Sequence, residues 1–241
     1  MFSDVHGNCL ALDKVLSDIE EQGVDGMVCL GDAIQGGAQP AETVTHLREA
    51  RIPTVMGNAD YWLLTGDNTS PEEQVSNAQM EVRAWSLSKL KKEDLDFTRQ
   101  FKNVITLPLD DQSLVCFHGS PGSFDEKIWP TTPEDDFMRM VGGCGSSILC
   151  GGHVHLQYLR RLGHSCLFNP GSVGSSWNHS QTVDEPRADS WAEYAIVSMD
   201  NRGSGLEFRR VPFDPEEWIG MTAKNGRPYP DRVSREYSGK V

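Results

Sequence analysis

The sequence lacks the marks of a membrane-spanning or secreted chain. Its apolar runs fall well short of the roughly 20 residues that a membrane-spanning helix needs. Its first residues do not show the basic and then apolar pattern of a signal peptide. The six cysteines include no CxxC pair, the spacing typical of zinc knots and redox motifs. We therefore expect a cytoplasmic protein with reduced, largely buried thiols and no membrane partner.

Positive charge is also scarce. The chain carries 22 Lys and Arg against 35 Asp and Glu, and no cluster of Lys and Arg is longer than a pair. A surface that follows the backbone of a long nucleic acid needs a basic stripe that releases counterions. Long nucleic acids are therefore excluded as substrates. Whether the chain forms a homo-oligomer stays open at this point.

The first third of the sequence alternates short apolar runs with helical patterns. The apolar runs cover 1–3, 27–30 and 52–56, and each ends in a polar signature. Between them, Leu12, Val15, Leu16 and Ile19 recur at helical spacing, and 41–50 follows a proline as a second helix. This strand and helix alternation predicts an α/β fold with a parallel sheet and right-handed crossovers.

A helical insert interrupts this pattern at about 65–105. Ser70-Pro71-Glu72-Glu73 has the composition of a helix start, so we predict helices over 71–90 and 91–101. Strands are predicted afterwards at 113–117, 147–150, 165–168, 194–199 and 206–211, the last two as a hairpin. Asp214-Pro215-Glu216-Glu217 predicts a final helix. The polar tail from about residue 225 is expected to be extended, and we expect one domain over 1–241, because neither a repeat nor a linker divides it.

Polar signatures follow five of the apolar runs: SDVHGN, VCLGD, TVMGNAD, LVCFHGS and ILCGGHVH. They place seven metal-ligand side chains where strands end, the rim at which open α/β folds bind ligands: Asp4, His6, Asp32, Asn58, His118, His153 and His155. Imidazole and carboxylate suit first-row transition metals, and seven ligands are too many for one ion. Two divalent ions that share a carboxylate would use all seven, and Mn, Fe, Zn and Ni remain open as their identity.

The motifs SDVHGN, GDAIQGG, GNAD, HGS and GGHVH resemble the blocks D-x-H, G-D, G-N-H-(D/E), H and G-H-x-H of the calcineurin-like metallophosphoesterase superfamily. NPGSVG at 169–174 is similar to its small bacterial phosphoesterase branch. The resemblance covers most of 3–211 and implies a four-layer α/β/β/α sandwich of two mixed sheets. It implies one metal on Asp4, His6, Asp32 and His155, and a second on Asp32, Asn58, His118 and His153.

The resemblance further implies a function. Asp32 and a solvent hydroxide would bridge the two metals, and the hydroxide would attack a small phosphomonoester or phosphodiester. Asp32 and Asn58 would be catalytic, and Asn58 would also contact the substrate. Two divalent ions outweigh two carboxylates and one hydroxide, so the centre attracts a small phosphorylated substrate although the chain is acidic.

Ala59 departs from the family pattern. Many relatives carry a His there, which helps to protonate the leaving oxygen, and general acid catalysis contributes about 10²–10⁴-fold. Water, Asp60 or a group from 174–190 is expected to replace it. Two further residues are substrate-binding candidates: Asn8, which alternatively caps the first helix, and Arg187, which alternatively forms a surface ion pair.

Two hypotheses compete with an enzyme acting on small esters. The first is a non-catalytic metal-binding scaffold of the same fold, supported in the sequence by Ala59 alone. The second is a serine/threonine protein phosphatase, weakened by Gln35 where such enzymes usually carry an Arg. The segment 175–190, with Trp177 and His179, is either a substrate lid or an exposed loop.

Overall fold

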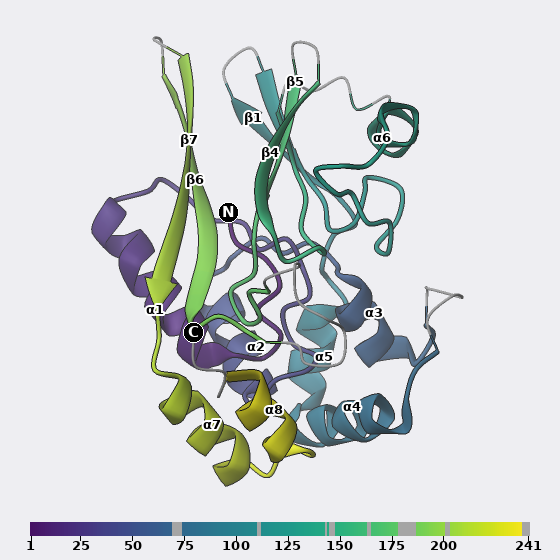
Figure 1. Ribbon diagram of the computed structural model, residues 1–241, viewed down its shortest axis with the longest axis vertical. Coiled ribbons are helices and arrows are strands. Elements are labelled where there is room, and N and C mark those ends of the chain that lie inside the picture. Colours follow the sequence, from purple (N-terminus) through teal and green to yellow (C-terminus); the bar gives the residue numbers. More distant parts are fainter. Residues whose placement is uncertain are drawn as a thin grey trace.

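The computed structural model describes residues 1–68, 74–109, 112–142, 144, 148–162, 165–177, 187–200 and 203–237. A mixed sheet of five strands runs in the order β1-β2-β3-β5-β4 (Figure 1). The strands are β1 Ile105–Leu109, β2 Gln112–Cys116, β3 Ile148–Cys150, β4 Gln157–Leu162 and β5 Ser165–Pro170. The inner pairs are parallel and the two outer pairs antiparallel. The α/β fold with a mixed sheet is confirmed, and the four-layer order stays a prediction.

The hairpin of β6 (Trp191–Asp200) and β7 (Gly203–Pro212) continues into the N-terminal segments. The Ala195 amide donates to the Met1 carbonyl, and parallel bridges then join Phe2 to Cys29 and Cys29 to Thr54. The predicted hairpin and the parallel order are confirmed. The runs 27–30 and 52–56, however, form single bridges instead of full strands, because each pairs for one or two residues before the chain turns at a Gly-Asp or Gly-Asn.

The first two helices lie where the sequence predicts them. α1 (Cys9–Gln22) begins at the side chain of Asn8 and ends at Gly23, whose φ of 63° closes the helix. Its buried face includes Leu12, Val15 and Ile19 and packs against β6 and β7. α2 (Pro40–Glu49) follows the loop after Asp32. Both helices begin directly after loops that carry the predicted ligands.

α3 (Asn58–Thr65) comes just before the predicted insert, and the insert contains α4 (Asn77–Lys89) and α5 (Lys92–Thr98). α4 begins at a capping box of Ser76 and Gln79, while the predicted start at 70–73 lies outside the described residues. α3 was not predicted, because its first residue belongs to the GNAD motif and it is only eight residues long. α6 (Glu134–Val141) was also missed, although Phe137 and Val141 give it a buried stripe.

The prediction of an extended tail is wrong. α7 (Pro215–Lys224) begins at Asp214 as expected, but a further helix, α8 (Pro230–Tyr237), follows it. Val233 is buried in the main core, and the ring of Tyr237 packs against Phe213 at 5.9 Å between centroids. One apolar contact per turn is enough to hold α8 in place, but it is too sparse to stand out in a polar sequence.

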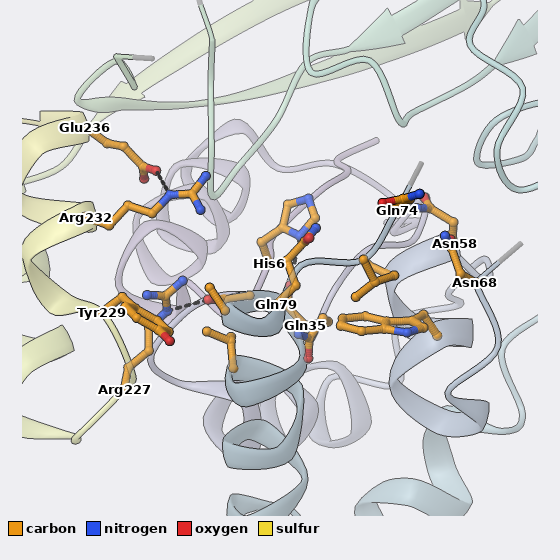
Figure 2. Close-up of a pocket in the computed structure, with 16 residues that line it drawn as sticks. His6, Gln35, Asn58, Asn68, Gln74, Gln79, Arg227, Tyr229, Arg232 and Glu236 are labelled. Atoms are coloured by element: carbon orange, nitrogen blue, oxygen red, sulfur yellow. Dashed lines mark hydrogen bonds and ion pairs between the residues drawn. The ribbon is translucent and has the colours of Figure 1, made fainter. Parts of the chain in front are cut away.

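A cavity of about 310 Å³ opens beside the N-terminal loops (Figure 2). α3 and α4 line one side of it, and the segment from Arg227 through α8 lines the other. All six cysteines are unpaired, as predicted. No helix among the described residues is long and apolar enough to cross a membrane. The fold therefore brings α8, far along the chain, beside the N-terminal loops that carry predicted ligands.

Candidate metal centre

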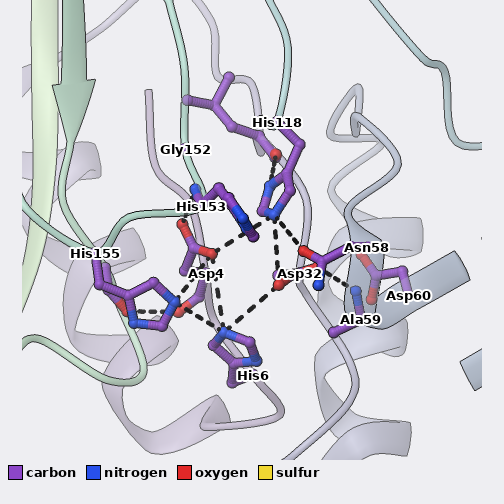
Figure 3. Close-up of polar contacts among 12 residues, drawn as sticks. Asp4, His6, Asp32, Asn58, Ala59, Asp60, His118, Gly152, His153 and His155 are labelled. Carbon is purple, nitrogen blue, oxygen red and sulfur yellow. Dashed lines mark hydrogen bonds and ion pairs between the residues drawn. The ribbon is translucent and has the colours of Figure 1, made fainter. Parts of the chain in front are cut away.

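All seven predicted ligands meet at one place (Figure 3). Asp4, His6 and His155 form one group, and Asp32, His118 and His153 form a second, each with ligand atoms within 4.8 Å of one another. Asp32 lies between the groups, with Oδ2 at 3.8 Å from His6 Nε2 and 3.4 Å from His118 Nε2. Asn58 Oδ1 lies 3.0 Å from His118 Nε2 and completes the second group.

The backbone is strained at these positions. Seven described residues other than glycine have positive φ, and five of them are the predicted ligands Asp4, His6, Asp32, His153 and His155, at 48–71°. This region costs such residues about 1–3 kcal/mol each and is tolerated where the surrounding structure enforces it. The concentration at one rim indicates that the fold gives up stability to direct these side chains inward.

Close backbone approach completes the geometry. Gly57 lies against Asp32, and a Cβ at Gly57 would overlap Asp32 Oδ1. The next amide but one, that of Ala59, donates to the same Oδ1 at 2.8 Å. Glycine before Asn58 therefore lets two loops from different strand ends touch, which fixes the orientation of the shared carboxylate.

Backbone carbonyls select which histidine nitrogen faces the centre. Nδ1 of His6 donates to the Gln35 carbonyl at 2.9 Å, and Nδ1 of His118 donates to that of Leu30 at 2.8 Å. His155 does the same with Ser175 at 2.7 Å. In the neutral form of these three rings, Nε2 therefore carries a lone pair that faces inward. His153 is reversed, because its Nε2 contacts the Asp125 carbonyl at 3.2 Å and Nδ1 remains.

This donor set fits a cation. His6 Nε2 and His155 Nε2 lie 3.1 Å apart, and with both Nδ1 atoms donating, two lone pairs face each other. Only a proton or a metal ion between them relieves that repulsion. Asp4 Oδ1 is buried without a hydrogen-bond partner among the described residues and lies 3.2 Å from His155 Nε2. Such an orphaned carboxylate oxygen is costly unless a cation binds it.

The carboxylates are ionised at neutral pH. Burial raises the pKa of Asp4, but the charge of a protonated His155 beside it outweighs burial and lowers it to about 2. The pKa of Asp32 lies well below its usual range, because His118 and the other imidazoles outweigh the same burial. Burial lowers the pKa of His118, but Asp32 and Asp4 raise it to about 10. Metal binding would displace this proton from His118.

Asp60 does not face the reacting centre. It is fully buried, and its two oxygens accept the amides of Ala33 and Ile34, each at 3.0 Å. Both oxygens are committed to the loop after Asp32, so these contacts do not support its predicted role as the replacement acid, which stays a prediction. Asp60 instead holds that loop in position. Burial, followed by the charge of Asp32, raises its pKa to about 7.

The three candidates for substrate binding, Asn8, Asn58 and Arg187, have different surroundings in the structure. Asn8 is wholly buried, accepts the amide of Ala11 and donates to the Gly174 carbonyl. Its capping role is confirmed, and its contact with phosphate stays a prediction without support from these contacts. Asn58 lines the cavity beside Ala59. Arg187 is exposed, and the role of Arg187 stays a prediction. The amide of its neighbour, Ala188, donates to the backbone carbonyl of Glu236 in α8. The lid hypothesis for 175–190 is untested, because His179 lies outside the described residues.

The structure adds residues that the sequence did not single out. Arg227, Tyr229 and Arg232 line the same cavity as His6 and Ala59. They come from the polar run GRPYPDR, which has no motif and no clear periodicity. Two arginines and a tyrosine within six residues are a compositional signal, but nothing in the sequence places that run beside His6.

The α/β fold and its rim of Asp, His and Asn define a protein with a candidate metal centre at the ends of its sheet segments. Residues 1–198 match the family model described as the calcineurin-like phosphoesterase superfamily domain, so the chain belongs to this superfamily. The resemblance inferred from the motifs is therefore confirmed.

Individual relatives agree with this assignment. The chain is 27% identical to the uncharacterised protein MJ0912 of Methanocaldococcus jannaschii, over 95% of this chain and 93% of that protein. It is 24% identical to the phosphodiesterase YfcE of Escherichia coli, over 82% and 85%. Two solved structures share the fold. One is a metallophosphoesterase from Sphaerobacter thermophilus (TM-score 0.71, 24% identity, 98% and 96% covered). The other is the hypothetical protein PH1004 from Pyrococcus horikoshii (TM-score 0.82, 17% identity, 100% and 98% covered).

Proposed function

We propose that the protein is a metal-dependent phosphoesterase that hydrolyses small phosphomonoesters or phosphodiesters. The observation that carries the proposal is the pair of Asp and His groups that meet at Asp32, with imidazole lone pairs and an orphaned carboxylate oxygen facing inward. Membership of the superfamily and the similarity to a phosphodiesterase support the same chemistry.

Two divalent ions bound here would activate water and draw charge from the phosphoryl oxygens. Asp4, His6, Asp32 and His155 would hold one ion, and Asp32, Asn58, His118 and His153 the other. The Ala59 amide keeps Asp32 oriented toward both groups through its bond to Oδ1. Asn58 lines the cavity, and its Oδ1 faces His118, so its amide nitrogen is available to donate to a phosphoryl oxygen.

The leaving group receives little help from position 59. Ala59 lines the cavity with a methyl group and has no proton to donate. Esters with good leaving groups should therefore be hydrolysed much faster than esters with poor ones. Ala59→His should reduce that difference by about tenfold or more, and an unchanged rate ratio between the two kinds of ester would refute the missing-acid explanation.

Turnover tests the proposed function directly. The metal-free protein is reconstituted separately with Mn²⁺, Fe²⁺, Zn²⁺ and Ni²⁺ and assayed on 4-nitrophenyl phosphate and bis(4-nitrophenyl) phosphate. We expect metal-dependent release of nitrophenol from at least one ester and its loss in Asp32→Asn. Metal binding without turnover of either ester would favour a scaffold, and a preference for one ester would separate phosphatase from phosphodiesterase.

A further inference from the structure

The outer side of the cavity is built by a segment that no motif marks. We call Arg227, Tyr229, Arg232 and Glu236 the C-terminal wall; all four line the cavity together with His6 (Figure 2). The guanidinium of Arg227 donates from Nε to the Gly36 carbonyl at 2.5 Å. Gly36 follows Gln35, whose carbonyl holds His6. The wall is thus attached to the loop that orients a predicted metal ligand.

Hydrogen bonds from the residues on either side of the wall also attach it to neighbouring loops. The Asn225 side chain donates to the Ala38 carbonyl at 3.0 Å, and the Tyr237 hydroxyl donates to that of Gly174 at 3.2 Å. Tyr229 has a φ of 60° and shares a side-chain hydrogen bond with Glu81 of α4. A strained tyrosine at a cavity mouth persists only when its surroundings enforce it. The wall is therefore a built part of the site.

The wall carries more positive than negative charge. It has two arginines and one carboxylate, because Glu236 is its only acid. Arg227 uses Nε and Nη1 on the carbonyls of Gly36 and Pro228, and the acid that interacts with its charge, Glu236, is also the partner of Arg232. Arg232 bonds Glu236 from Nε at 3.2 Å, and its guanidinium extends from α8 toward His6 (Figure 2). An anion in the cavity would meet two guanidinium groups that share one carboxylate.

Another residue that lines the cavity, Gln35, lacks a hydrogen-bond donor for its side-chain oxygen. Gln35 is only 5% exposed and lines the cavity, and its Oε1 has no hydrogen-bond partner among the described residues. A buried amide oxygen left in this state is costly, so a ligand that donates an N–H or O–H bond gains by entering. Trp62 and Tyr229 line the same cavity and supply flat apolar faces.

We propose that this cavity binds the organic group of the ester, and that this group carries a second anion, a carboxylate or a phosphate, which Arg227 and Arg232 recognise. The proposal rests on the proposed phosphoesterase function. It narrows the substrate to small doubly anionic esters with one ring or sugar, because a cavity of about 310 Å³ is at the lower end for ligand sites.

Three aryl phosphates that differ in the second group on the ring test the proposal. In 4-carboxyphenyl phosphate and hydroquinone bisphosphate that group is anionic, and in the control, 4-carbamoylphenyl phosphate, it is neutral; the first two are called the anionic esters and the third the neutral one. With Mn²⁺-loaded protein, kcat/KM should be about tenfold or more higher for an anionic ester than for the neutral one, as expected for a charge-assisted contact. Which anionic ester is preferred separates carboxylate from phosphate. Arg232→Gln should bring the ratio toward one, and Glu236→Gln should increase it by removing the competing acid.

Arg235→Gln is the matched control, since Arg235 is on α8 but does not line the cavity. An anionic to neutral ratio of one or less in the unaltered protein would overturn the proposal, as would an equal fall in Arg235→Gln.

A binding measurement separates this proposal from the proposed function. The metal-free protein is titrated calorimetrically with 4-hydroxybenzoate and with 4-hydroxybenzamide. We expect the benzoate to bind about tenfold tighter, and Arg232→Gln to remove the difference. Preferential binding without any turnover would refute the phosphoesterase function alone. Turnover without preference in either assay would refute the role of the C-terminal wall alone.

Discussion

The rim of the metal centre, through His6 and Asn58, lines the same cavity as the C-terminal wall, but the two are built in opposite ways. The rim consists of loops after buried segments, with five ligands at strained φ and with Asp4 and His118 fully buried. The wall consists of a short, partly exposed helix and the turn before it, anchored by a few hydrogen bonds and Val233. Under the two proposals the contrast corresponds to two tasks: strained, buried geometry would serve the chemistry, and a surface element held by few contacts would select the substrate.

The largest expected effect breaks the rim. His155→Ala removes an inward-facing Nε2, so the ion proposed beside Asp4 would have an incomplete set of ligands. Turnover should therefore fall by about 10²–10³-fold. His46→Ala is the control: His46 pairs with Asp13 at 2.8 Å on the surface, away from the centre. Assays of both variants on bis(4-nitrophenyl) phosphate check this. Equal activity of the two would show that His155 is not a ligand.

The next effect concerns the close backbone approach at the rim. Gly57→Ala places a methyl group on Asp32 and the start of its loop, so we expect a loss of about 2–4 kcal/mol in stability, together with weaker metal binding. Gly220→Ala is the matched control, because a Cβ there meets nothing within 4 Å and α7 continues through it. That change should stabilise the protein by about 0.5–1 kcal/mol. Urea unfolding measures the change in the free energy of unfolding for each variant, and the two changes must have opposite signs.

The smallest effect loosens the wall without touching the rim. Val233→Ala removes two methyl groups from a side chain that is 5% exposed, so about 1–2 kcal/mol of stability should be lost. Because α8 then moves more freely, KM for 4-carboxyphenyl phosphate should rise while metal content stays the same. Ser234→Ala, on the same helix, should change both by little. A fall in metal content in Val233→Ala would mean that wall and rim are not separable.

The same contrast explains what the sequence predicted. The rim was predictable because His and Asp directly after apolar runs are rare and the order of the segments brings their ends to one edge. The wall was not, because Arg227 and Tyr229 follow Gly and Pro, and α8 has little apolar periodicity beyond Val233. Its position depends on where the hairpin of β6 and β7 delivers the chain, which is a long-range property. Asp60 shows a third case, where the residue type was noticed but its two backbone contacts could be seen only in the fold.

Metal stoichiometry tests the central claim most directly. The metal-free protein is titrated with Mn²⁺ in a calorimeter, and bound metal is quantified by elemental analysis after dialysis, in parallel with Asp32→Asn. We predict two ions per chain for the unaltered protein, and weakened binding of both in Asp32→Asn, because Asp32 is the ligand that both groups share. Saturation at one ion per chain, or an Asp32→Asn variant that still binds two ions equally well, would contradict a centre of two ions joined at Asp32.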